Sequence, residues 1–221
     1  MPSGDRGVTV LRIASQGDAD NDFFPITIYH FVYTTPMTKT AVGAIELSSI
    51  GIGYRVQDEM LKSASVDLLI ARTICSGKYL IVVGGNIDAV EAAMQTALTI
   101  GDDAVIDHLT VANAHEAVFP AMAQSVVLSP EDIGALGIIE TFSGVSALVA
   151  ADYAGKAARV TLFRLHVAMA LGGKGLLMMT GSVSDVTAAV QVAANAVRER
   201  GLLVSEVVIP RPSVELFQDY I

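Results

Sequence analysis

Cys75 is the only cysteine among the 221 residues of this sequence, and its thiol is a potential metal ligand. It lies in the stretch RTICSGKYL, between a strand-like apolar run and a Ser-Gly turn. A single thiol cannot form a disulfide within its own chain. A lone cysteine in an apolar run is usually a small buried hydrophobe, whereas iron–sulfur sites normally use several cysteines. Cys75 is therefore either inert or one ligand of a site that only a multimer completes.

Other side chains show no catalytic constellation. Glu46 and Glu140 recur in the similar stretches AVGAIEL and ALGIIET, where a structural hydrogen bond is favoured over acid–base catalysis. Residues 172–174, GGK, lack the spacing of a phosphate-binding loop. No Ser/His/Asp or Cys/His order is present, so we expect no enzyme. Four histidines also lack metal-ligand spacing: His30, His108, His115 and His166.

Composition and charge exclude two classes of partner. The net charge of −9 offers no electrostatic reason to bind nucleic acid, because phosphate binding needs clustered Lys and Arg. No basic amphipathic stretch suggests a membrane surface. The longest apolar region, Val167 to Met179, is interrupted by Gly172, Gly173 and Lys174 and is too short to span a bilayer. The N-terminus does not resemble a secretory signal, so a cytosolic protein is expected.

The chain contains two copies of one unit. Gly43 to Leu69 aligns with Gly137 to Phe163 without a gap, and after a slip of two residues Gly77 to Ala97 aligns with Gly173 to Ala193. The slip falls beside Cys75, so the two copies diverge at the loop that holds the thiol.

Each unit is predicted to be an α+β layer, with helices packed on an antiparallel-rich sheet. In the first helix of the first unit, Val56, Met60, Leu61 and Ala64 form the predicted apolar face. Asn86 and Asp88 are candidate caps of the second helix. The predicted strands of the first unit are Ala41–Leu47, Val66–Ile74, Lys78–Val83 and Val105–Val111, the middle two forming a hairpin.

These boundaries predict two domains and an extension. We expect the first domain at residues 39–128 and the second at 129–221, since Ser129, Pro130 and Gly134 interrupt both periodicities. Residues 1–38 match neither unit. They are expected to be an extension, in which FFPITIYHFVYTTP is either a short edge strand or a tail without fixed structure. The extension is either accessory or precedes a natural start at Met37.

Both units resemble the bacterial microcompartment (BMC) shell domain. The resemblance runs from about Thr40 to Phe217 and rests on AVGAIEL and ALGIIET, DEMLKSASV and DYAGKAARV, SGKYLIVVGG and GGKGLLMMTG, and the final VIPRP. Two fused domains resemble the tandem class in its unpermuted order, in which three chains form a pseudohexameric tile. The resemblance implies a structural protein of the microcompartment shell, inside the bacterial cytoplasm. It would act as a homotrimer that meets other shell proteins edge to edge.

Within the tandem class, TICSGK resembles a group with a cysteine at this loop position, although Ser76 stands where proline is typical. In that group three copies hold a [4Fe-4S] cluster at the central pore. The resemblance implies one cluster per trimer with three Cys75 ligands, electron transfer across the shell, and encapsulated redox enzymes as partners. The second unit's loop, VAMALGGKG, has no cysteine, and it either lines the ring or packs away from it. The implied pore-loop residues are Ile74, Ser76, Gly77, Leu171 and Gly172.

Lys62, Lys156 and Arg211 resemble the residues through which such tiles meet at their edges. The alternative is a solvated surface, which is where most helical lysines lie. The first unit has Asn113–His115 where the second has Arg211, so two kinds of edge are expected. Two other functions stay open. One is a tile with an open pore for small metabolites and no cluster, and the other is a small-ligand sensor.

Overall fold

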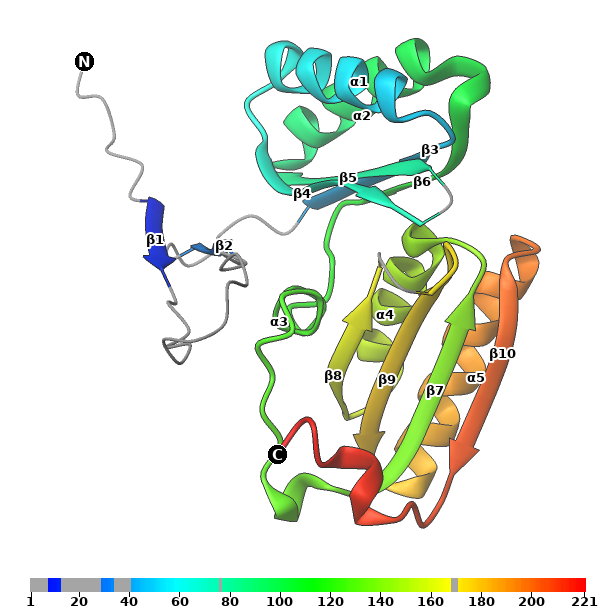
Figure 1. The fold of residues 1–221 in the computed structure, drawn as a ribbon. Coiled ribbons are helices and arrows are strands. Elements are labelled where there is room, and N and C mark those ends of the chain that lie inside the picture. Colours follow the sequence, from blue (N-terminus) through cyan, green and yellow to red (C-terminus); the bar gives the residue numbers. More distant parts are fainter. Residues whose placement is uncertain (1–7, 13–28, 34–40, 76, 168–170) are drawn as a thin grey trace, which may run out of the picture. The chain divides into compact units, whose positions relative to one another are not determined.

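The computed structural model divides the chain into two units, Met1–Thr38 and Lys39–Ile221 (Figure 1). It describes residues 8–12, 29–33, 41–75, 77–167 and 171–221. In the N-terminal part, Met1–Thr38, β1 (Val8–Arg12) pairs antiparallel with β2 (Tyr29–Tyr33). The rest of the predicted extension lies outside the described residues.

The first repeat folds as the sequence predicts. Its strands form one antiparallel sheet in the order β4-β5-β3-β6, and β4 and β5 form the expected hairpin. The elements are β3 (Ala41–Leu47), α1 (Ile50–Ser63), β4 (Asp67–Ile74), β5 (Lys78–Gly85), α2 (Ile87–Gly101), a short 3-10 turn (Asp102–Ala104) and β6 (Val105–Val111).

The second repeat has the same architecture, with sheet order β10-β7-β9-β8, which is the first order read from the opposite edge. Its elements are β7 (Ala135–Thr141), α4 (Gly144–Ala157), β8 (Val160–His166), β9 (Gly175–Gly181), α5 (Val183–Glu199) and β10 (Leu203–Ile209). Each sheet carries its two helices on one face (Figure 1). The G-x-I-E strand leads each repeat, so the order is unpermuted. The linker holds α3 (Val118–Met122) and a 3-10 turn (Pro130–Asp132), and η3 (Val214–Phe217) follows β10.

Serine caps both helices that follow a leading strand. The Ser49 hydroxyl accepts from Ile52 N at the start of α1, and the Ser143 hydroxyl accepts from Ser146 N at the start of α4. Side-chain caps of this kind satisfy N–H groups that have no partner inside the helix.

Two details of the predicted helices are wrong. Asn86 alone caps α2, accepting from Ala89 N, because Asp88 already lies in the first turn. Leu61 is 41% exposed and not part of the apolar face. It follows the fully buried Met60 and lies about 100° further round the helix, which turns its side chain to solvent.

The leading strand of the first repeat is buried on both faces. Ala41, Ile45 and Leu47 pack beneath α1 and α2. Val42 and Ala44 point the other way and share a hydrophobic cluster with α4 of the second repeat. The helix of one repeat therefore covers the sheet of the other. We call this contact the inter-repeat joint.

Candidate functional site

Cys75 lies in the tight β4–β5 hairpin at the inter-repeat joint. Ile74 and Lys78 form the last strand pair, and Cys75 and Gly77 lie in the turn between the two strands. Gly77 has φ 76°, the left-handed conformation that three-residue hairpin loops place on glycine. Cys75 is partly exposed, and Ser76 lies outside the described residues.

The corresponding loop of the second repeat lies beside this hairpin. A Cβ atom built on Gly173 would be 3.6 Å from the Cys75 carbonyl oxygen and 3.4 Å from Lys78 Nζ. Gly172 and Gly173 both have positive φ, at 61° and 84°. Gly172 is exposed and Leu171 partly exposed. The structure thus places next to each other the two loops that hold the implied pore-loop residues.

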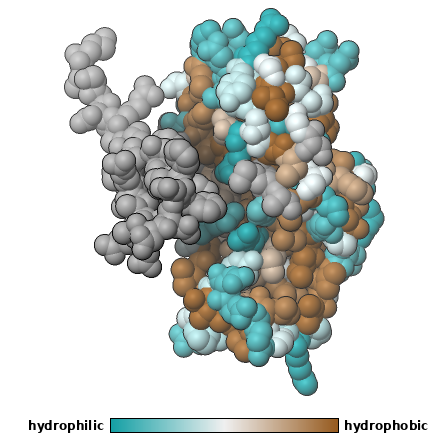
Figure 2. Space-filling view, viewed as in Figure 1, coloured by the Kyte–Doolittle hydropathy of each residue, from teal (hydrophilic) through white to brown (hydrophobic). Residues whose placement is uncertain are grey.

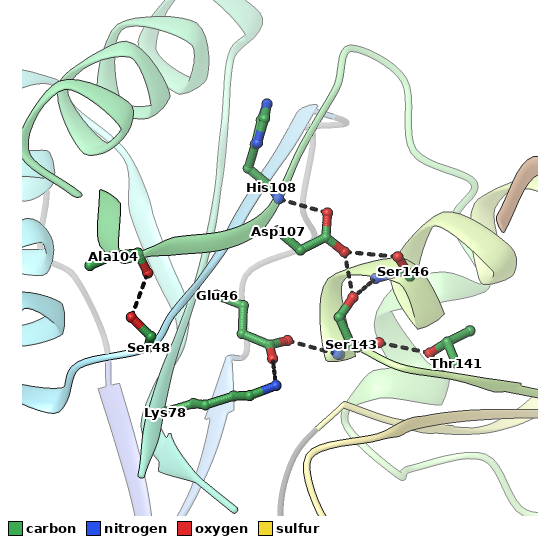
Figure 3. Close-up of polar contacts among 10 residues, drawn as sticks. Glu46, Ser48, Lys78, Ala104, Asp107, His108, Thr141, Ser143 and Ser146 are labelled. Atoms are coloured by element: carbon green, nitrogen blue, oxygen red, sulfur yellow. Dashed lines mark hydrogen bonds and ion pairs between the residues drawn. The ribbon is translucent and has the colours of Figure 1, made fainter. Parts of the chain in front are cut away.

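A buried carboxylate connects the Cys75 hairpin to the second repeat. Lys78, at the base of the hairpin, places Nζ 2.8 Å from Glu46 Oε1. Glu46 Oε2 accepts from the backbone N of Gly144, the first residue of α4, at 2.9 Å. Figure 3 shows both contacts. Glu46 is fully buried, and the lysine and the positive end of the helix together balance its charge. Glu46 has the structural role that the sequence favours.

A second buried carboxylate, Asp107 on β6, holds the same end of α4 (Figure 3). It accepts hydrogen bonds from the hydroxyls of Ser143 and Ser146, the latter at 2.8 Å. It also pairs with Arg200, which follows α5 and donates to His108 O at 3.0 Å. Removal of a buried charge of this kind leaves its partners unsatisfied. Asp107 therefore fixes the two repeats to each other.

Glu140, which matches Glu46, has different surroundings. Lys174 lies 2.8 Å from Glu140 Oε1, as Lys78 does from Glu46, and the Ser205 hydroxyl donates to Glu140 Oε2 at 3.2 Å. The hydrogen bond from Lys174 lowers the pKa of Glu140, and the bond from Ser205 adds to this effect. No helix start reaches Glu140 among the described residues. Its side chain is 32% exposed, against 0% for Glu46.

The family model for the BMC domain matches residues 41–114 and 135–212, which span both repeats. The chain belongs to the BMC-domain family of microcompartment shell proteins. Its role is therefore structural, as the absence of a catalytic constellation predicts, and its place is the microcompartment shell within the bacterial cytoplasm. The expected α+β fold of two tandem BMC domains is confirmed.

Two curated relatives resemble the chain over most of its length. It is 43% identical over 181 residues to the microcompartment shell protein PduT of Citrobacter freundii, covering 82% of this chain and 97% of the relative. It is 34% identical over 197 residues to the carboxysome assembly protein CcmO of Synechococcus elongatus, covering 83% of this chain and 70% of CcmO.

Two solved structures share its architecture. A microcompartment protein from Desulfitobacterium hafniense DCB has 39% identity and a TM-score of 0.72, covering 80% of this chain and 97% of that one. The fused permuted hexameric shell protein MSM0275, from the RMM microcompartment, has 24% identity and a TM-score of 0.54. It covers 75% and 87% of the two chains and supports the fold alone.

The predicted tile-edge lysines of the two BMC domains differ in their environment. Lys62 pairs with Asp58 on the exposed face of α1. Lys156 lies 2.7 Å from Asp152, which is buried because the first domain covers it. The backbone N of His115 donates to Asp152 at 2.8 Å, so the NAH segment of the first domain packs on α4 within the chain. Arg211 is exposed.

The described residues of a single chain do not supply a complete set of ligands for a metal cluster. In the part of the chain that the structure places, no group of three or more His, Cys, Asp or Glu side chains lies close enough to bind a metal ion. A thiolate is nevertheless the side chain that iron–sulfur clusters prefer. Cys75 therefore fits such a cluster as a single ligand per chain. Among the described helices, none is long and apolar enough to cross a membrane.

Sequence reasoning missed the residues that join the two BMC domains, Asp107, Ser143, Ser146 and Arg200. Two signals were available. Asp107 lies in an apolar strand, VIDHLTV, at a position that can face inward. The sequence of α4, GVSALVAADYAGKA, is apolar nearly all round, which is typical of a helix buried on both sides.

Proposed function

We propose that three copies of this chain form a pseudohexameric shell tile in which the three Cys75 side chains hold one [4Fe-4S] cluster at the central pore. The cluster would transfer single electrons across the shell, to or from redox enzymes enclosed by it. The proposal rests on the surfaces that one chain leaves uncovered and on the position of Cys75.

The observation that carries the trimer is a difference between matching sheet faces. In the first domain, Ala44, Leu80 and Val82 point away from their own helices and are completely buried, in one cluster with α4. The matching residues of the second domain are only partly buried: Ile138, Leu176 and Met178. Figure 2 shows apolar surface over this second sheet.

The helices show the complementary difference. Leu148 of α4 is 2% exposed because the first domain's sheet covers it. Tyr54, its match on α1, is 60% exposed. The described part of one chain therefore leaves exposed a helix face on α1. It covers only partly the sheet face around Ile138 and Met178, which pack beside Phe217, whereas a helix covers the matching face of the first domain. A second copy can join these two surfaces head to tail, with the inter-repeat joint as the template.

Head-to-tail contacts close into rings when the rotation between units permits. If the chain–chain joint repeats the inter-repeat joint, all six domains of a three-chain ring are related alike. Each Cys75 hairpin then takes the same place about the threefold axis. Three thiolates are the donor set that one chain lacks, and the fourth iron would need a ligand other than Cys75.

Anaerobic purification tests the cluster directly. The expected protein has the broad visible absorbance of an iron–sulfur cluster and about four iron atoms per trimer. Cys75→Ser should be trimeric and free of iron. Wild-type protein that is trimeric but lacks iron would favour the open-pore tile instead. A monomer in solution at all concentrations would contradict the trimer.

A further inference from the structure

We propose that Glu140 accepts a hydrogen bond from the backbone N of Ile50, the first residue of α1, in the next copy of the chain. This inference rests on the proposed trimer and specifies its chain–chain joint. Glu140 is then a recognition residue for a second copy, and its site is incomplete in one chain.

The first domain supplies the template. There, Glu46 accepts from Lys78 Nζ on one oxygen and from the backbone N of Gly144 on the other. Repeat alignment matches Glu46 with Glu140, Lys78 with Lys174, and Gly144 with Ile50. Two of these three matched groups already contact each other in the second domain, because Lys174 lies 2.8 Å from Glu140. Among the described residues, the second domain lacks only the contact between its glutamate and the start of a helix.

Glu140 is prepared as an anionic acceptor. The hydrogen bonds from Lys174 and Ser205 lower its pKa, so the carboxylate is charged at neutral pH. Its partial exposure leaves it open to an approaching donor. The start of a helix is a suitable partner, since its first N–H groups lack partners inside the helix and carry partial positive charge.

Ile50 is a suitable donor. Ser49 caps α1 as Ser143 caps α4, since each serine hydroxyl accepts from the residue three positions on. Within the described chain the structure gives the N–H of Ile50 no hydrogen bond. Ile50 is 36% exposed, so a second copy can reach this residue.

Apolar side chains extend the same match. Val207 on β10 pairs with Ile138 in the register in which Leu109 on β6 pairs with Ala44. Leu109 packs against the cluster that contains α4, whereas Val207 is 41% exposed. Val207 therefore takes the place of Leu109 and would face α1 of the next copy.

The chain–chain joint lacks one anchor of its template. Asp107 pairs with Glu46 across the sheet, and the residue that pairs with Glu140 is Ser205. A serine that donates to Glu140 cannot supply the carboxylate that holds the start of α4 in the first domain. Glu140 is then the main anionic group at this joint, so its loss should weaken assembly more than folding.

Ile50→Pro tests the donor without removing a side-chain cap. Proline lacks the N–H but is favoured at the first position of a helix. The preceding residue, Ser49, has φ −128° and ψ 127°, a conformation compatible with a following proline. The fold should therefore survive, and far-UV circular dichroism checks this. Glu140→Gln removes the charge of the acceptor, and Glu206→Gln, on an exposed position of β10, is the matched surface control.

Sedimentation equilibrium of the full chain measures the result. Loss of a hydrogen bond to a charged group should weaken each joint about tenfold. Three joints close each ring, so the concentration at which half the chains are trimeric should rise about 30-fold. The double variant Ile50→Pro/Glu140→Gln should be no weaker than the stronger-acting single variant, because both remove one bond.

Wild-type assembly of both single variants, or effects that multiply in the double variant, would overturn the Glu140–Ile50 contact while leaving the tile intact. A wild-type chain that forms no trimer would instead remove the proposed function on which the contact rests.

Discussion

Glu46 and Glu140 occupy the same place in two copies of one fold, yet one is buried and the other is about one-third exposed. Both carboxylates hold a lysine from the base of a hairpin. Among the residues that the structure describes, Glu46 alone of the two also meets the start of a helix, which comes from the other repeat. The difference lies in what covers each sheet. The described part of one chain completes this contact at Glu46 and leaves Glu140 partly exposed.

The largest difference should appear between Leu148→Ala and Tyr54→Ala. Leu148 is buried under the first repeat, so its truncation should lower the free energy of unfolding by about 2–5 kcal/mol. Tyr54 contacts Tyr79 at a ring-centroid distance of 4.9 Å but is mostly exposed. Its truncation should cost a single chain about 1 kcal/mol. It should nevertheless impair assembly.

Urea unfolding below the assembly concentration measures the stability of both variants, and sedimentation measures assembly. Equal destabilisation of single chains by the two substitutions would contradict the difference between the covered and uncovered helix faces.

The next effect concerns Asp107, which has no acidic match in the second repeat. Asp107→Asn should lower the free energy of unfolding by about 3 kcal/mol, because Arg200 and two serine hydroxyls lose a buried charged partner. Ser205→Ala at the matching position should cost about 1 kcal/mol or less. Urea denaturation of the two variants provides the comparison. A larger loss for Ser205→Ala would show that Asp107 does not hold the repeats together.

A third effect links Glu46 to the Cys75 hairpin. Glu46→Gln weakens the charged hydrogen bond to Lys78, which lies at the base of the Cys75 hairpin. The position of the hairpin loop should therefore be less well fixed. We expect the purified variant to retain about half of the wild-type iron or less, in line with the sensitivity of metal sites to residues behind the ligands. Cys75→Ser, which should bind no iron, is the negative control of this iron assay. Full iron content in Glu46→Gln would exclude a positioning role for Glu46.

The smallest effect is the pH dependence due to Glu140. Because its folded pKa lies below the ordinary value of 4.5, it stabilises the fold above that pH. The contribution is lost as the pH falls from 4.5 through the lower folded pKa. Solvent screening limits it to less than about 1 kcal/mol. Urea midpoints between pH 7 and pH 3 should therefore fall slightly less for Glu140→Gln than for wild type. If the urea midpoints of Glu140→Gln and wild type fell equally between pH 7 and pH 3, Glu140 would not contribute to the pH dependence of stability.

Much of each repeat could be predicted because its determinants are local. Apolar periodicity, the Ser-Gly turn and the internal match predicted the strands and the hairpin that holds Cys75. They left open whether the loop of the second repeat lies beside that hairpin. Leu61 was misplaced because it adjoins Met60 in sequence but not on the helix face. The inter-repeat joint could not be predicted, since the contacts of Asp107 with Ser143 and Arg200 join residues far apart in the chain. An aspartate in an apolar strand indicates that a polar partner is needed, but the sequence does not say which residues are its partners.

Native mass spectrometry of the anaerobically purified protein tests the central claim most directly, because it counts chains and iron in one measurement. The proposed tile predicts one dominant species of three 23.1 kDa chains plus the mass of a single [4Fe-4S] cluster. Cys75→Ser should give the same trimer without that added mass. A wild-type spectrum of single chains, or of trimers without iron, would contradict the account.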